Sequence, residues 1–450
     1  MTLTILRRAP WLLACGALAA CAAYHPAPLA TAPSLQSQVD ALQHVLPDGR
    51  AIALNAPLAL PDVAALAVLN NPDLVAARTR HDVAAAELLS AGLPPDPTIS
   101  GGFAALVSGA ATMPSISAAF MQDVGALVTY KLDKQAARAG LAQVDAGILW
   151  QEWQVAAQAE QLDVSLAADQ AMIDSLRQDT TPLAAVDAQT QLQVQRANLS
   201  LTDGAASLTA LAAAQAALDT AVQNQAHDCD QLDALLGLQP GTKVALAPPV
   251  VAPLAPGVIA PAIATLAQRR PDLIALRYGY AQADATLRAA ILSQFLPISL
   301  GATGHRDTSG IGSAGPQVSL TLPLFNRNRG GIAMARASRA QLGAQYQASL
   351  DAAAGGARAL ADSIALLQAQ AAMDAPEAAR AAAIARAASQ AYAAGAISAS
   401  SFASLQTAAG AREQTLIGLR AQVQTAEISL TTLLGLGLPT LGPAPKDAPL

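Results

Sequence analysis

The feature that constrains this chain most is a unit that occurs twice. The first copy is NNPDLVAARTRHDVAAAELLSAGLPPDPTIS, residues 70–100, and the second is RRPDLIALRYGYAQADATLRAAILSQFLPISL, residues 269–300. Each copy starts near Pro-Asp-Leu, continues as an alanine-rich helical pattern and leads through Leu-Pro into a segment with Ile, Ser and Gly. A repeat of this kind predicts two copies of one structural plan rather than unrelated domains.

The N-terminus predicts export and a lipid anchor. Arg7 and Arg8 precede an apolar run, residues 11–20, that is too short to span a membrane as a mature helix. The run ends in Leu-Ala-Ala-Cys, which resembles a bacterial lipobox and implies cleavage before Cys21, with diacylglycerol and a fatty acyl chain on that cysteine. Ala22 follows it in place of the Asp associated with inner-membrane retention. An ordinary signal peptide with an incidental cysteine is the alternative.

Alternating segments in both copies predict strands. In residues 317–324 Val318 and Leu320 alternate with polar residues, and residues 298–303 and 115–120 and a looser glycine-rich stretch, 98–107, behave in the same way. A tilted strand of about ten residues crosses a bilayer. After the signal peptide no segment predicts a transmembrane helix, because the longest apolar tracts gain their hydrophobicity from alanine. Four strands cannot close a barrel, so closure would need several chains.

Long helices fill most of the remaining sequence. We expect them over residues 126–178, 185–236, 332–394 and 399–434, with turns at Asp179–Pro182 (DTTP) and Gly395–Ser398 (GAIS). At 1.5 Å per residue the first helix would run roughly 80 Å. It carries a seven-residue repeat, which predicts a coiled-coil seam: Leu141, Ile148, Val155, Leu162 and Leu176, with Asp169 in the remaining position.

These patterns give a domain organisation. We expect a cleaved signal peptide at 1–20, a lipidated extension at 21–60, a first repeat at 61–238, a proline-rich linker at 239–261, a second repeat at 262–437 and a tail at 438–450. Each repeat would contain a helix, two strands and a long helical hairpin. The fold class is therefore mainly α with a membrane β part.

Composition and motifs argue against several classes of function. A net charge of −6 and a pI near 5.3 leave no basic stripe for a nucleic-acid partner. The five histidines are isolated, so neither a metal centre nor another cofactor is expected, and processing would leave Cys229 without a disulfide partner. The sequence contains no pattern of a nucleophile with its base and no phosphate-binding loop, so we expect no enzyme. Trp150 and Trp153 are expected to pack, and the Asp of each Pro-Asp-Leu to favour a helix N-terminus.

The lipobox, NNPDL and RRPDL, the two strand pairs, LPLFNRNRGGIAMARA, AYAAGAISASSFASLQTA and LLGLGLP together resemble the TolC-type outer membrane efflux proteins in their lipid-anchored form. The similarity covers about residues 60–439. It implies a homotrimer in which three chains form a twelve-stranded outer membrane barrel and an α-helical tunnel in the periplasm. It also implies a passive exit duct that docks on a periplasmic adaptor and an inner-membrane pump of the RND type.

The same resemblance assigns roles to the helical turns. Gly395, Ile397 and Ser398 match the family's tip turn, where adaptor contact is expected, and glycine permits a left-handed backbone there. Thr180 and Thr181 would occupy the first tip, although DTTP departs from the family's glycine turn.

Asp179 and Asp187 have two interpretations. Around a trimer axis, three copies of either would form a carboxylate ring at the pore gate that favours cations. Alternatively, Asp179 caps the returning helix or its turn and Asp187 is solvated on a helix face.

Two questions of function stay open at this level. A lipid-anchored periplasmic coiled-coil scaffold or adaptor without a pore would explain the lipobox and the heptads, but not four strands in two equivalent positions. The substrates would be drugs or heavy-metal cations. PPDPTIS and LFNRNRGGIAMARA are similar to the heavy-metal branch of the family, whereas the lipobox is commoner in the drug-exporting branch.

Overall fold

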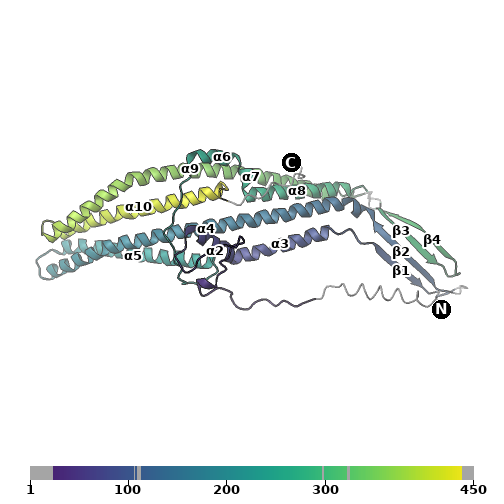
Figure 1. Cartoon of the computed structure of the whole chain (residues 1–450), viewed down its shortest axis with the longest axis horizontal. Coiled ribbons are helices and arrows are strands. Elements are labelled where there is room, and N and C mark those ends of the chain that lie inside the picture. Colours follow the sequence, from purple (N-terminus) through teal and green to yellow (C-terminus); the bar gives the residue numbers. More distant parts are fainter. Residues whose placement is uncertain (1–23, 106, 109–112, 296–297, 322–324, 438–450) are drawn as a thin grey trace. The chain divides into compact units, whose positions relative to one another are not determined.

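The computed structural model describes residues 24–105, 107–108, 113–295, 298–321 and 325–437. Residues up to Leu35 form a unit apart from the rest, and their described part, 24–35, contains neither helix nor strand. The remainder of the chain consists of long helices and one small sheet (Figure 1). The signal peptide, Cys21 and the C-terminal tail from residue 438 lie outside the described residues.

The element order repeats across the two halves. After the short helix η1 (Val39–Ala41), the first half contains α2 (Leu60–Asn70), α3 (Pro72–Ala91), β1 (Thr98–Ala104), β2 (Ser115–Asp123), α4 (Val124–Gln195) and α5 (Leu201–Leu235). The second half contains α6 (Pro256–Ala264), α7 (Leu266–Arg269), α8 (Pro271–Leu292), β3 (Ile298–Arg306), β4 (Gly312–Leu320), α9 (Arg329–Ala393) and α10 (Ala399–Leu433). The structure thus has the expected helix, strand pair and helical hairpin in each half.

The two Pro-Asp-Leu motifs begin equivalent helices. Pro72 and Pro271 stand at the first position of α3 and α8, where a missing N–H leaves no hydrogen bond unmade, and Asp73 and Asp272 follow in the first turn. A carboxylate in the first turn is favoured by the helix dipole. Both motifs therefore act as helix starts, as the sequence predicts.

Each motif also holds the end of a returning helix. The Asn71 side chain donates a hydrogen bond of 3.1 Å to the Leu235 carbonyl at the end of α5, and Arg270 donates one of 3.2 Å to Leu433 at the end of α10. These carbonyls belong to the last turn of a helix, which has no helical partner for them. The duplicated motif thus joins the start of one helix to the end of another in both halves.

Each half has its own hydrophobic core beside this junction. In the first, α2 packs on α4 and the end of α5; in the second, α6 and α7 pack on α9 and the end of α10 (Figure 1). Buried leucines dominate both cores. They include Leu66, Leu162, Leu232 and Leu236 in the first and Leu266, Leu273, Leu430 and Leu434 in the second.

The predicted break at Asp179–Pro182 is wrong, because α4 continues through Pro182 to Gln195. A proline inside a helix costs about 3 kcal/mol through its lost N–H and its ring clash. Burial offsets this cost: Leu183 is 1% exposed and Val186 5%, in a cluster with Phe402 of α10. Burying such side chains contributes about 1.5–3 kcal/mol each. Tertiary packing therefore carries α4 across a residue that by itself predicts a break.

One helical stretch meets the length and composition of a membrane span, contrary to the sequence expectation. Gly204–Leu235, most of α5, has a mean hydropathy of 1.3 in its most apolar window, and 11% of that window is buried. Much of this hydropathy comes from alanine. In the structure α5 packs along α4, with Ala221, Leu232 and Leu235 buried. Its contacts are those of one arm of a helical hairpin.

The four strands form one antiparallel sheet in the order β1-β2-β3-β4. The hairpin of the first half pairs with that of the second through β2 and β3, with Phe120 opposite Ala302. Strand β4 covers residues 312–320, so it begins earlier than the alternating segment at 317–324 predicts. Leu322 and Leu324 of that segment lie outside the described residues. The sheet brings together two hairpins that are almost 200 residues apart in the chain.

Candidate functional site

One face of the sheet is mostly apolar and exposed, with Gln122 and Arg306 near its ends as the polar exceptions. The register places Ile99 beside Phe120, Phe103 beside Ile116, and Leu300 beside Val318. Ile99 is 81% exposed and Val318 66%, although both are large and hydrophobic. An exposed apolar patch of this kind marks a surface that contacts lipid or another protein.

The other face of the sheet carries small and polar side chains. Because side chains alternate along a strand, the residues between those of the apolar face point the opposite way. They include Ser100, Ser117, Ala119, Ser299, Thr303, His305, Ser313, Gln317 and Ser319, together with glycines, and Met121 is the one large apolar side chain among the described residues of this face. One sheet therefore separates an apolar surface from a polar one.

Both edges of the sheet are open in one chain. Among the described strands β1 pairs with β2 alone, and β4 pairs with β3 alone. An edge strand presents unpaired N–H and C=O groups, which cannot stay unpaired in lipid. In a membrane this sheet would need further strands from other chains.

The second hairpin turns at the predicted place. Gly395 has φ +70°, and its N–H donates to the Tyr392 carbonyl at 2.9 Å. The Ser398 hydroxyl then accepts the Ser401 N–H at 3.1 Å and caps α10. Ile397 packs against the apolar cluster around Phe402. The left-handed glycine and the serine cap together make this turn.

The first hairpin turns at Arg196–Ser200, where no break was predicted. Ala197 has φ 59°, its N–H donates to Val194 at 2.9 Å, and the Asn198 N–H donates to Gln193 at 2.9 Å. Gly395 and Ala396 make the same two bonds in the second hairpin. The two turns are thus equivalent, but an alanine occupies the left-handed position in the first. Alanine gives no sequence signal for such a turn, so the pattern pointed to Pro182 instead.

This difference predicts opposite effects of exchanging the two residues. Gly395→Ala would place a Cβ in the left-handed region and destabilise its turn by about 1–2 kcal/mol. Ala197→Gly would remove that strain at the other turn, offset in part by about 0.4–1 kcal/mol of unfolded-state entropy. Hydrogen exchange of turn amides should show faster opening around residue 395 and slower opening around residue 197. Shifts of the same sign in both variants would contradict the equivalence of the turns.

Asp179 contacts α10 instead of ending a helix. Its carboxylate accepts a hydrogen bond of 2.9 Å from Gln406 and lies against Gly410, where any Cβ would overlap a carboxylate oxygen. Burial raises the pKa of Asp179, and the hydrogen bonds from Gln406 and Gln414 oppose that rise. The prediction that it caps the returning helix is therefore wrong. Gly410 makes the space that lets α4 and α10 meet at this carboxylate.

Asp187 is buried between α4 and α5. It is 8% exposed and accepts hydrogen bonds from the Ser207 hydroxyl at 2.9 Å and from Gln191 at 3.3 Å. The alternative of a solvated face residue is wrong, because the α5 serine covers it. Both candidate gate carboxylates thus have partners within one chain.

Comparisons with known proteins support one family. Residues 262–436 match the model of outer membrane efflux proteins. Three solved structures share the fold along most of their length. CusC is 18% identical, with a TM-score of 0.69 over 92% of this chain and 99% of that one. VceC of Vibrio cholerae is 17% identical, with a TM-score of 0.71 over 84% of this chain and 97% of that one, and CmeC of Campylobacter jejuni is 15% identical, with a TM-score of 0.69 over 93% of this chain and 95% of that one. In sequence, the second half of the chain thus matches the outer membrane efflux protein model, and in fold the chain resembles these three proteins. A search of the curated proteins found no match.

The structure also places the remaining predicted residues. Thr180 and Thr181 lie inside α4, more than ten residues before its end, and their hydroxyls donate to the carbonyls of Leu176 and Arg177. They are therefore not at the helical turn. Gly395, Ile397 and Ser398 lie at the turn of the second hairpin, as predicted. No group of three metal-ligating side chains is found among the described residues.

Proposed function

We propose that this protein is the outer membrane channel of a tripartite system. It would act as a passive exit duct, formed by a trimer, that docks on a periplasmic adaptor and an RND-type inner-membrane pump. It would supply no catalytic step and hold no resident cofactor. A lipid on Cys21 would add an anchor to the membrane. Small toxic compounds, either drugs or heavy-metal cations, would be its cargo.

The sheet is the observation that carries this proposal. It has an exposed apolar face, a polar face and two open edges. Three such sheets joined edge to edge would pair every edge strand, with the apolar faces toward lipid and the polar faces around an aqueous lumen. CmeC and MtrE of Neisseria gonorrhoeae, which share this fold, are described as outer membrane channels.

The turns of the two hairpins are the proposed adaptor contacts. The two turns follow the ends of α4 and α9, which are the ends of these helices that are remote along the chain from the preceding strands. Residues 196–200 are exposed. The first contact is therefore proposed at residues 196–200 in place of Thr180 and Thr181. A gate ring of Asp179 or Asp187 stays a prediction. It would require these carboxylates to leave their hydrogen-bond partners within the chain and to turn toward the pore axis.

Single-channel recording from the purified full-length protein tests this function. We expect stepwise conductance in planar bilayers and a trimer that resists dissociation in unheated SDS gels. A lipid-anchored scaffold without a pore, which the strands do not favour, would give no conductance. It would also be released from membranes as a monomer by salt or lipase, and that result would refute the duct.

A further inference from the structure

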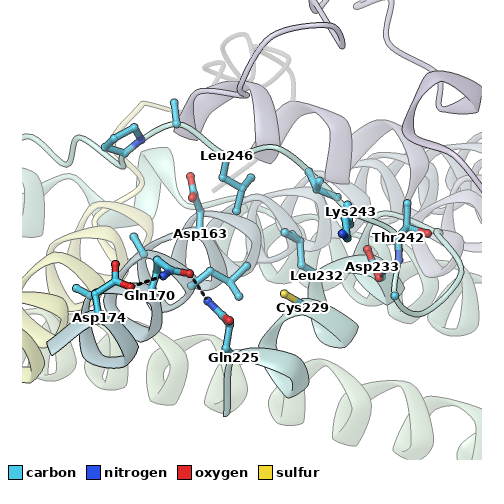
Figure 2. A pocket seen from close by; sticks show the side chains of 17 residues that line it. Asp163, Gln170, Asp174, Gln225, Cys229, Leu232, Asp233, Thr242, Lys243 and Leu246 are labelled. Carbon is cyan, nitrogen blue, oxygen red and sulfur yellow. Dashed lines mark hydrogen bonds between the residues drawn. The ribbon is translucent and has the colours of Figure 1, made fainter. Parts of the chain in front are cut away.

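A cavity in the helical part of the molecule, away from the sheet, suggests a binding site beyond the duct. It has a volume of about 730 Å³ and lies between α4, α5 and the loop at residues 241–248 (Figure 2). Cavities of roughly 300–1,000 Å³ are of the size that holds small molecules. Its apolar lining includes Leu166, Leu232, Val244 and Leu246.

Asp163 is the feature of this cavity that calls for a partner. The residue is 1% exposed and lines the cavity, and neither of its carboxylate oxygens has a hydrogen-bond partner in the described structure. Isolating an ionised carboxylate from water without a partner costs several kcal/mol. Burial raises the pKa of Asp163 to about 6, so the group is still mainly ionised at neutral pH. Its position favours a cation beside it.

The surrounding charges have the sign that attracts a cation. The charged residues of the lining are Asp163, Asp174, Asp233 and Lys243, which gives a formal net charge of −2. Lys243 leaves both Asp163 oxygens unpaired. The pKa of the Cys229 thiol, also in the lining, is raised first by burial and then by neighbouring carboxylates, of which Asp233 lines the cavity.

The lining selects among cations. A hard metal ion takes about six or more oxygen ligands, and no group of three metal-ligating side chains is found among the described residues. The lining has no aromatic side chain, so it offers no cage for a quaternary ammonium. An ammonium with N–H groups can donate to both oxygens of Asp163, and Gln170 and Gln225 add polar groups on the same wall.

We propose that this cavity binds a small organic ammonium ion whose N–H groups pair with Asp163 and whose apolar part packs on the leucines of α4, α5 and the 241–248 loop. The loop is the first part of the linker that follows α5. The ligand would thus tie this loop to the hairpin of α4 and α5, independently of whether the protein conducts.

Isothermal titration of the full-length protein in detergent with phenethylammonium chloride tests the proposal. We expect one saturable site per chain, binding at least about tenfold weaker for 2-phenylethanol, and no saturable binding of phenylacetate. Asp163→Asn should weaken binding by about tenfold or more. Asp169→Asn is the matched control, because Asp169 is on the same helix and has a buried oxygen without a partner but does not line the cavity.

A second measurement uses the unmodified protein, in case Asp163→Asn does not fold. Phenethylammonium keeps its charge below pH 8, whereas Asp163 becomes protonated as the pH falls through about 6. Affinity should therefore fall between pH 7.5 and pH 5. Asp174, Asp233 and Lys243 also line the cavity, and burial and Asp163 raise the pKa of nearby Glu160 to about 7, so the variant and the pH profile must agree. Absence of saturable binding, equal binding by Asp163→Asn, or equal loss in Asp169→Asn would overturn the proposal. The first of these would leave a basic side chain of another chain as the partner of Asp163.

Discussion

For the proposed channel, Ala302→Arg is expected to prevent assembly into the outer membrane, whereas Thr303→Arg is expected to assemble. The two residues are adjacent in β3, a central strand of the sheet, and they belong to opposite faces. Ala302 is opposite Phe120 on the apolar face, and Thr303 is opposite Ala119 on the polar one. An arginine facing lipid near the middle of a bilayer costs about 2–4 kcal/mol. A trimer carries three copies, which makes the penalty roughly 6–12 kcal/mol.

The measurement is the amount of heat-resistant trimer in outer membrane fractions, followed by single-channel recording. Thr303→Arg should give normal amounts of trimer and a channel shifted toward anions, because three positive charges would then line the lumen. Its trimer serves as the control for the added bulk and charge. Equal assembly of both variants would show that neither face of the sheet contacts lipid, and would remove the main support for a duct.

The repeat explains why much of this fold follows from the sequence. Each half supplies its own evidence for a helix start at Pro-Asp-Leu, a strand pair and a long hairpin, so the same pattern is tested twice. Gly395 is predictable because a left-handed residue at a helix end is usually glycine. Trp150 and Trp153 were expected to pack, and Trp150 lies under the Arg270 guanidinium, with 4.7 Å from Cζ to the ring centroid.

The errors occur where tertiary contacts overrule local preference. Pro182 predicts a helix break, but buried Leu183 and Val186 keep α4 intact. Ala197 takes a left-handed conformation that its side chain disfavours, and nothing in the local sequence announces it. Asp179 depends on Gly410, more than 200 residues later, for the space it occupies. The unpartnered carboxylate of Asp163 is equally invisible to sequence, because its burial depends on the loop that follows α5.

Arg270→Ala is expected to destabilise the protein by about 3–5 kcal/mol, the largest effect we expect outside the sheet. Arg270 is 6% exposed, forms an ion pair of 2.6 Å with Asp272, stacks on Trp150 and donates to the Leu433 carbonyl. Removing it leaves the Asp272 carboxylate, 22% exposed, without this partner and uncaps the end of α10. The shift in the urea midpoint of the detergent-solubilised protein measures the loss.

Arg269→Ala is the matched control, since its side chain donates one hydrogen bond, to the Thr265 hydroxyl one turn earlier. The free energy of unfolding of this variant should fall by less than about 1 kcal/mol. Arg270→Lys separates charge from shape. Lysine keeps the positive charge but lacks the planar fork that pairs with Asp272 and covers Trp150. If charge alone matters, the Lys variant will match the wild type; we expect it to lose at least half of the Arg270→Ala effect. In the first half Asn71 donates to the equivalent carbonyl of Leu235 with an uncharged amide, so a directed donor makes this junction there without a charge.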